Sequence, residues 1–144
     1  MAPVIAARES GSSGAKIVVR GLNVSYRTER GDTKQALAAV DMDVHAREVL
    51  ALIGPSGCGK TTFLRVLNRM NDTVSGISVT GSVLFDGVDV YGPKVDPVAV
   101  RRRIGMVFQR AQLFPMTVWD NVAYGLRAHG VRRHEELAPR VEAA

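Results

Sequence analysis

The fold is decided by one stretch of the chain, Gly54-Pro55-Ser56-Gly57-Cys58-Gly59-Lys60-Thr61. This stretch matches the pattern G-x-x-x-x-G-K-[ST], which is typical of a glycine-rich loop between a strand and a helix. The flanking residues fit that context. Glu48–Ile53 reads as a short apolar strand buried on both faces. Residues 62–70 place Phe63, Val66, Leu67 and Met70 at helical spacing on one face.

The loop has the composition of a phosphate-binding site. Glycines let successive N–H groups turn inward, where a Cβ would obstruct an anion. The helix that follows directs its positive N-terminus to the same point. Lys60 would add a full charge near the β- and γ-phosphates, and the Thr61 hydroxyl would bind Mg²⁺. Further backbone or hydroxyl contacts are expected from Ser56, Gly57, Gly59 and Thr62. The loop therefore predicts a nucleoside triphosphate with Mg²⁺ as the ligand.

The rest of the sequence predicts an α/β fold around this loop. Strands are expected at Lys16–Tyr26, Ala38–Ala46, Thr80–Phe85 and Ile104–Phe108. The first two of these should form an antiparallel hairpin or meander. Helices are expected after Pro97, from the cap Thr117 to about His129, and from Val131 to the last residue. Residues 1–15 are rich in Ala, Ser and Gly and are interpreted as a flexible leader.

Composition limits the classes of protein to which this chain can belong. The 144 residues are 46% hydrophobic and 23% charged, which is globular rather than disordered. No apolar run approaches the roughly 18 residues of a membrane span. Cys58 is the one cysteine, so an internal disulfide is impossible. The net charge of +5 favours anionic partners. Nucleic acid is not among the expected partners, because Arg101–Arg103 lack interleaved aromatic residues.

Several motifs together resemble the ATPase subunits of ABC transporters. The stretch 54–62 is similar to their Walker A loop, and Val107-Phe108-Gln109 is similar to their Q-loop. Tyr26 matches the family's A-loop aromatic residue. Within the family, Leu67–Asp72 and Asn121–Arg127 resemble the ATPases of phosphate importers. The resemblance extends over nearly all of residues 16–130.

The resemblance implies a P-loop NTPase core of the ABC type with an antiparallel β subdomain. Residues 16–109 would form these two parts, and residues 110–144 would begin a helical subdomain. ATP would be bound by the A-loop and Walker A residues, namely Tyr26, Gly54, Pro55, Ser56, Gly57, Cys58, Gly59, Lys60, Thr61 and Thr62. Lys60 and Gln109 would be catalytic, and Thr61 and Gln109 would contact Mg²⁺.

The resemblance also implies partners and a location. The expected function is ATP hydrolysis coupled to import of inorganic phosphate. The subunit would lie peripherally on the cytoplasmic face of the cell membrane, paired with a second copy and bound to two permease subunits. Two alternatives remain open. One is a non-catalytic nucleotide-binding or interfering fragment, and the other is an importer ATPase for another solute, such as amino acids.

Three family motifs have no match in the sequence. These are the LSGGQ-like signature, a Walker B strand ending in Asp followed by a catalytic Glu, and the switch histidine. Val83–Asp86 is only a superficial match, because Gly87 stands where the Glu would be. Phosphoryl transfer needs phosphates, metal and water positioned together. The expectation is therefore an incomplete nucleotide-binding domain that does not hydrolyse ATP alone, with strand edges and apolar surface left open.

Overall fold

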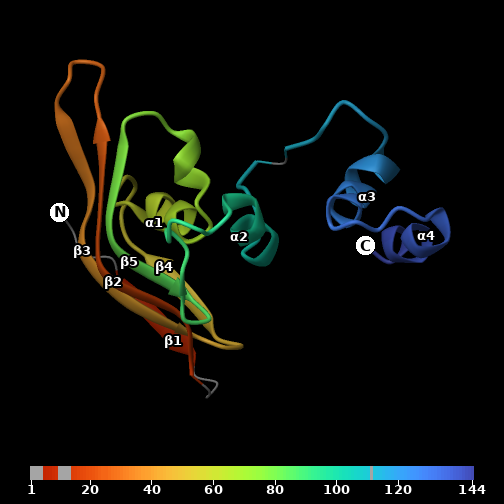
Figure 1. Cartoon of the computed structure of the whole chain (residues 1–144), viewed down its shortest axis with the longest axis horizontal. Coiled ribbons are helices and arrows are strands. Elements are labelled where there is room, and N and C mark those ends of the chain that lie inside the picture. Colours follow the sequence, from red (N-terminus) through yellow and green to blue (C-terminus); the bar gives the residue numbers. More distant parts are fainter. Residues whose placement is uncertain (1–4, 10–13, 111) are drawn as a thin grey trace. The chain divides into compact units, whose positions relative to one another are not determined.

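The computed structural model describes residues 5–9, 14–110 and 112–144. The chain divides into two compact units, Met1–Gly105 and Met106–Ala144 (Figure 1). This division falls before Gln109, where the sequence predicted the boundary between the core and the helical subdomain. Each unit is described by itself.

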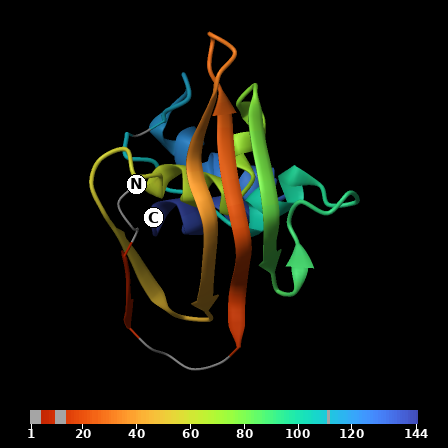
Figure 2. The ribbon, with the colours of Figure 1, turned by 90° about the vertical axis from the view of Figure 1, so that its left-hand side faces the viewer.

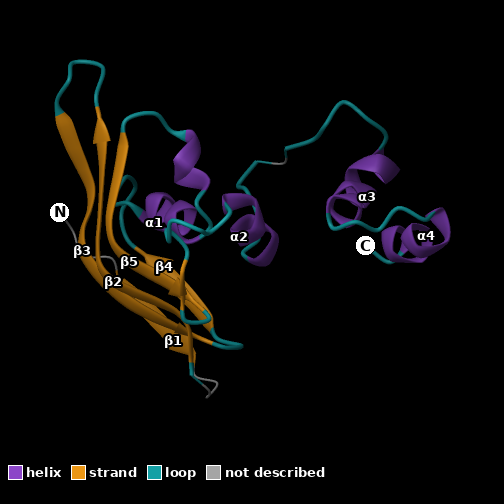
Figure 3. Ribbon diagram, viewed as in Figure 1, coloured by secondary structure: helices purple, strands orange, loops and turns teal. Residues whose placement is uncertain are grey.

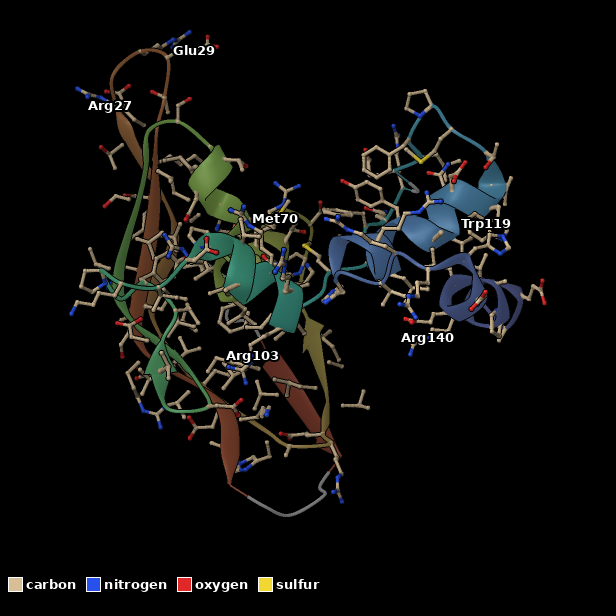
Figure 4. The ribbon with its side chains drawn as sticks, turned by 45° about the vertical axis from the view of Figure 1, so that its right-hand side comes forward. Arg27, Glu29, Met70, Arg103, Trp119 and Arg140 are labelled. Atoms are coloured by element: carbon tan, nitrogen blue, oxygen red, sulfur yellow. The ribbon has the colours of Figure 1, made fainter. Side chains whose placement is uncertain are left out.

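An antiparallel sheet forms the frame of the first unit. Its strands are β2 (Ala15–Arg27), β3 (Thr33–His45), β5 (Ile77–Phe85) and β6 (Val88–Asp89), in the order β3-β2-β5-β6 (Figure 2). The predicted hairpin is confirmed, since β2 and β3 pair antiparallel and place Tyr26 opposite Lys34. Arg27 and Glu29 lie at the tip of this hairpin (Figure 4).

Two helices and a short 3₁₀ helix follow the glycine-rich loop in this unit. They are α1 (Lys60–Leu67), η1 (Met70–Thr73) and α2 (Pro97–Arg103). Phe63, Val66 and Leu67 of α1 are buried, as the helical spacing predicted. They share one core with buried residues of the sheet, of the turn after β6 and of α2, namely Val19, Leu22, Val24, Leu37, Val83, Val90 and Val100. The core therefore holds the start of α1 against the β2–β3 hairpin.

The strand before the loop differs from its prediction. β4 (Val49–Ile53) is present, but Val49 is 74% exposed and Ile53 is 58% exposed, so it is not buried on both faces. β4 pairs antiparallel with β1 (Ile5–Glu9) rather than lying between parallel neighbours. An open strand edge pairs with whatever extended backbone reaches it.

Two strands include residues of the stretch 1–15 that the sequence analysis interpreted as a flexible leader. Ile5–Glu9 form β1, and Ala15 begins β2, while the flexibility of this stretch stays a prediction. Short backbone stretches gain hydrogen bonds by pairing even where composition is rich in small residues. Residues 1–4 and 10–13 of the leader lie outside the described residues.

The second unit contains two helices, α3 (Val118–Ala128) and α4 (His134–Glu142). The cap at Thr117 and the break around Gly130 are confirmed. The ring of Trp119, which Figure 4 labels on α3, stacks on that of His134 with centroids 5.4 Å apart. This contact joins the two helices.

The strand predicted at Ile104–Phe108 is wrong. These residues have no regular secondary structure, and Figure 3 draws them as loop. Val107 is 97% exposed. An apolar run becomes a strand only when another strand takes its backbone hydrogen bonds, and none does so here.

The α/β class itself is confirmed, with sheet and helices packed on one core. No described helix is long and apolar enough to cross a membrane.

Candidate functional site

Two glycines give the loop between β4 and α1 its shape. Gly57 has φ +78° and Gly59 has φ +101°, which are left-handed conformations that side chains disfavour. At Gly59 there is also no room, because an added Cβ would lie 2.8 Å from the Ala36 carbonyl oxygen and 2.8 Å from Leu37 Cδ2. At Gly57 the same atom would meet nothing within 4 Å. Gly59 therefore lets the loop approach β3 closely.

Cys58 packs against Gly54 within the loop. Its side chain is buried, and a Cβ at Gly54 would lie 2.8 Å from its sulfur. The Cys58 amide donates to the Pro55 carbonyl at 3.4 Å, which closes a tight turn. Gly54, Pro55 and Cys58 were predicted as ligand contacts, and they are not among the residues that line the adjacent cavity. Their contact with a ligand stays a prediction.

The first turn of α1 presents donors without acceptors. The helix begins after Gly59, which offers no side-chain cap. Phe63 is the first residue of α1 whose amide has a backbone acceptor. It donates to the Gly59 carbonyl at 2.8 Å. Among the described residues nothing accepts from the amides of Lys60, Thr61 and Thr62. Free amides at a helix start attract anions, above all phosphate.

Lys60 folds back over the loop. Its Nζ donates to the carbonyl oxygens of Gly54 at 2.7 Å and Pro55 at 2.8 Å, and lies 3.5 Å from the Cys58 sulfur. These carbonyls are weaker partners for an ammonium group than a phosphate is. A phosphate at the loop could therefore draw Lys60 away from them.

A cavity of about 490 Å³ opens beside the loop. It lies between the β2–β3 hairpin and the start of α1, and the Tyr26 hydroxyl donates a hydrogen bond to Thr62 Oγ1 at 3.4 Å between these two parts. Its volume is in the range of small-molecule and cofactor sites. The residues lining it are Tyr26, Lys34, Gln35, Ala36, Ser56, Gly57, Gly59, Lys60, Thr61 and Thr62.

The cavity brings together seven of the residues predicted from sequence, on two separate parts of the chain. It also includes three that the sequence analysis missed, namely Lys34, Gln35 and Ala36. These three lie on β3, and only the hairpin register places them across from Tyr26. No motif marks them, so only a correct register could have found them.

Gln109 lies in the second unit, where it is exposed at a bend after the extended segment. The structure does not place this unit relative to the loop. The role predicted for Gln109 at Mg²⁺ and at the attacking water stays a prediction.

The donor set fits Mg²⁺ bound with a nucleotide. Nowhere in the described ranges do three or more His, Cys, Asp or Glu side chains gather as a metal site. Mg²⁺ bound with nucleotides needs no such cluster, because it keeps waters and takes phosphate oxygens plus one or two protein oxygens. The Thr61 hydroxyl, on the cavity wall one residue after Lys60, is such an oxygen.

Comparison with known proteins places this site in a family. Residues 37–144 match the family model described as ABC transporter. The chain is also 53% identical over 126 residues to the Phosphate import ATP-binding protein PstB 2 of Lactobacillus acidophilus. That alignment covers 88% of this chain and 48% of the relative. The chain thus spans about half the length of the curated relative it matches.

Proposed function

We propose, for a chain that belongs to the ABC transporter family, that it binds Mg-ATP in the cavity beside the glycine-rich loop. The observation that carries this proposal is the set of unbonded amides at Lys60, Thr61 and Thr62, facing a cavity of nucleotide size. No other described helix start combines free amides with a glycine-rich loop and a lysine.

Each side chain of the site has a separate task in this proposal. Tyr26 stacks on the adenine, since its ring lies on the cavity wall near Thr62. The amides of the α1 start hold the β- and γ-phosphates, and Lys60 leaves its loop carbonyls to neutralise them. Thr61 contributes its hydroxyl to Mg²⁺, which would neutralise charge on the phosphates. Gln109 would contact Mg²⁺ or the attacking water.

The transported solute is proposed from the relative. The named relative is a phosphate import ATP-binding protein, and the identity of 53% extends over most of this chain. We therefore assign this chain to the ATP-binding part of an importer of inorganic phosphate, with ATP hydrolysis in the complete assembly. It would act on the cytoplasmic face of the membrane with a second ATPase subunit and two permease subunits.

Substitution of Lys60 tests nucleotide binding. Lys60→Ala should weaken Mg-ATP binding at least about tenfold, because a charge-assisted contact to phosphate is lost. The measurement is titration with a fluorescent ATP analogue. The matched control is Lys94→Ala, since Lys94 is exposed and does not line the cavity. Equal affinity in Lys60→Ala and the wild type would contradict the proposed site.

Permease capture tests the solute. The chain, co-expressed with the permease pair of a phosphate importer or with that of an amino-acid importer, should co-purify with the first pair only. Capture by the amino-acid permease pair instead would favour the alternative solute. Capture by neither pair would count against the proposed transporter role while leaving ATP binding to the titration above.

A further inference from the structure

The cavity beside the loop is lined by positively charged residues from two separate elements. Its lining includes Lys60, at the start of α1, and Lys34, on β3, and it includes no Asp or Glu. The remaining lining residues are neutral. A ligand here meets two cations and no repelling carboxylate, which suits a polyphosphate.

The two lysines differ in what holds them. Lys60 already donates to two loop carbonyls, at 2.7 and 2.8 Å. The side chain of Lys34 takes part in no hydrogen bond or ion pair with any residue that the structure describes, and Lys34 is exposed. The ammonium group of Lys34 can therefore bind a ligand without first breaking a hydrogen bond or ion pair within the protein.

The strand register fixes which end of the ligand Lys34 would meet. Lys34 is the direct partner of Tyr26 in the antiparallel β2–β3 pair, so the two side chains lie on the same face of the sheet. Directly opposed residues have Cβ atoms about 5 Å apart. Lys34 thus lies beside Tyr26, which would hold the base, whereas the amides that would hold the terminal phosphates belong to the start of α1.

We infer that Lys34 is a second nucleotide-binding cation of this cavity, which contacts the phosphate nearest the ribose. The inference rests on the proposed function, in which Tyr26 carries the adenine and Lys60 carries the β- and γ-phosphates. A nucleoside diphosphate and a triphosphate share the phosphate nearest the ribose. Lys34 therefore contributes equally to the binding of ADP and ATP.

The alternative is that Lys34 is a solvated lysine at a strand end. Exposed lysines usually contribute little, and an ordinary surface charge would influence a ligand only through weak, screened attraction. The two interpretations predict different losses of nucleotide affinity when Lys34 is replaced. They also differ in whether that loss requires the position beside Tyr26.

The experiment measures ADP and ATP affinity of the full chain in buffer with Mg²⁺, using calorimetry or fluorescent analogues. Lys34→Gln should weaken both nucleotides by the same factor, about five- to tenfold. Lys34→Arg, which keeps the charge, should remain within about twofold of the wild type. Lys94→Gln removes an equal charge from a residue outside the cavity and should change neither affinity.

The outcomes separate this inference from the proposed function. A loss in Lys34→Gln confined to ATP would place Lys34 at the terminal phosphate and overturn the inference, as would unchanged affinity. An equal loss in Lys94→Gln would show a general charge effect and also overturn it. If the wild type binds neither nucleotide while its far-UV circular dichroism shows a folded chain, the proposed function itself fails. Matching thermal unfolding of Lys34→Gln and wild type, without nucleotide, confirms that the variant reports binding rather than folding.

Discussion

Two helices of this chain begin in opposite ways. α1 follows Gly59, which has a left-handed backbone and no side chain to cap the helix, and its first turn has no acidic residue. α3 follows Thr117, whose hydroxyl oxygen accepts from the Asp120 amide at 3.1 Å. The Thr117 hydroxyl also donates to the Asp120 carboxylate at 2.6 Å. Each helix has free amides to satisfy at its start, and only α3 satisfies one of them with its own side chains.

The difference favours the start of α1, rather than that of α3, as the proposed anion-binding site. At α3 an internal carboxylate already occupies the positive end of the helix, and the arrangement stabilises structure. At α1 the amides and the dipole are left for something outside the chain, and a lysine stands where a carboxylate would otherwise be expected. A helix start that carries a cation and no cap is less stable alone and gains that stability when an anion binds.

The largest effect is expected from filling the space at Gly59. Gly59→Ala should lower the free energy of unfolding of the first unit by about 3 kcal/mol, because φ +101° is strained for alanine and its Cβ would meet the Ala36 carbonyl. Nucleotide binding should be lost with it, since the loop must move away from β3. The measurements are urea unfolding followed by hydrogen exchange of the core, together with ATP titration.

Gly57→Ala is the matched control for this substitution. Gly57 also has a positive φ, of +78°, but an added Cβ meets nothing within 4 Å. We expect a loss of about 1 kcal/mol from backbone strain alone. If the two variants lost equal stability, the close approach of the loop to β3 would not be what requires glycine.

Removing the cap of α3 should have a smaller and more local effect. Thr117→Ala should destabilise α3 by about 1 kcal/mol, because the Asp120 amide loses its acceptor. Hydrogen exchange of the Asp120 amide should accelerate accordingly. ATP affinity should not change, since this cap lies outside the nucleotide cavity. A change in ATP affinity would show that the start of α3 also serves binding.

The smallest effect is expected on acidification. The hydrogen bond from the Thr117 hydroxyl, and then Arg127 at 2.8 Å, hold the pKa of Asp120 below its ordinary value of 3.8. A lowered pKa means that the contribution of Asp120 to stability is fully present above the ordinary value and is lost as the pH falls through the lowered one. Helix α3 should therefore lose hydrogen-exchange protection only in strong acid.

Asp120→Asn should remove this acid dependence while keeping the size of the side chain. The titration of the Asp120 carboxylate by NMR checks the sign directly. A midpoint above the ordinary value would contradict the geometry at Thr117. The start of α1, which has no carboxylate, should show no comparable acid transition.

Prediction from sequence succeeded where structure follows from local chemistry. The glycine-rich loop, the amphipathic face of α1 and the cap at Thr117 each depend on residues within one or two turns of each other. The hairpin of β2 and β3 was also predicted, because its two strands are joined by a short turn. In each case the residues that form the element lie close together in the chain.

Prediction failed where an element needs a distant partner. The predicted strands Glu48–Ile53 and Ile104–Phe108 have similar apolar patterns, yet Val49–Ile53 of the first forms a strand by pairing with Ile5–Glu9 and the second forms none. An apolar run indicates that a segment can be buried. Whether a neighbouring strand is present to pair with it depends on the rest of the fold. The strand at Ile5–Glu9 was missed for the same reason.

The sequence by itself determined the chemistry of this protein. The spacing of Gly54, Gly59, Lys60 and Thr61 predicts a loop that would bind phosphate, because the pattern combines a glycine-rich backbone with a cation. Tertiary structure decided which side chains share the cavity, because the β2–β3 register sets Lys34 beside Tyr26. Register depends on the packing of a whole sheet, and a one-residue shift would turn Lys34 to the other face.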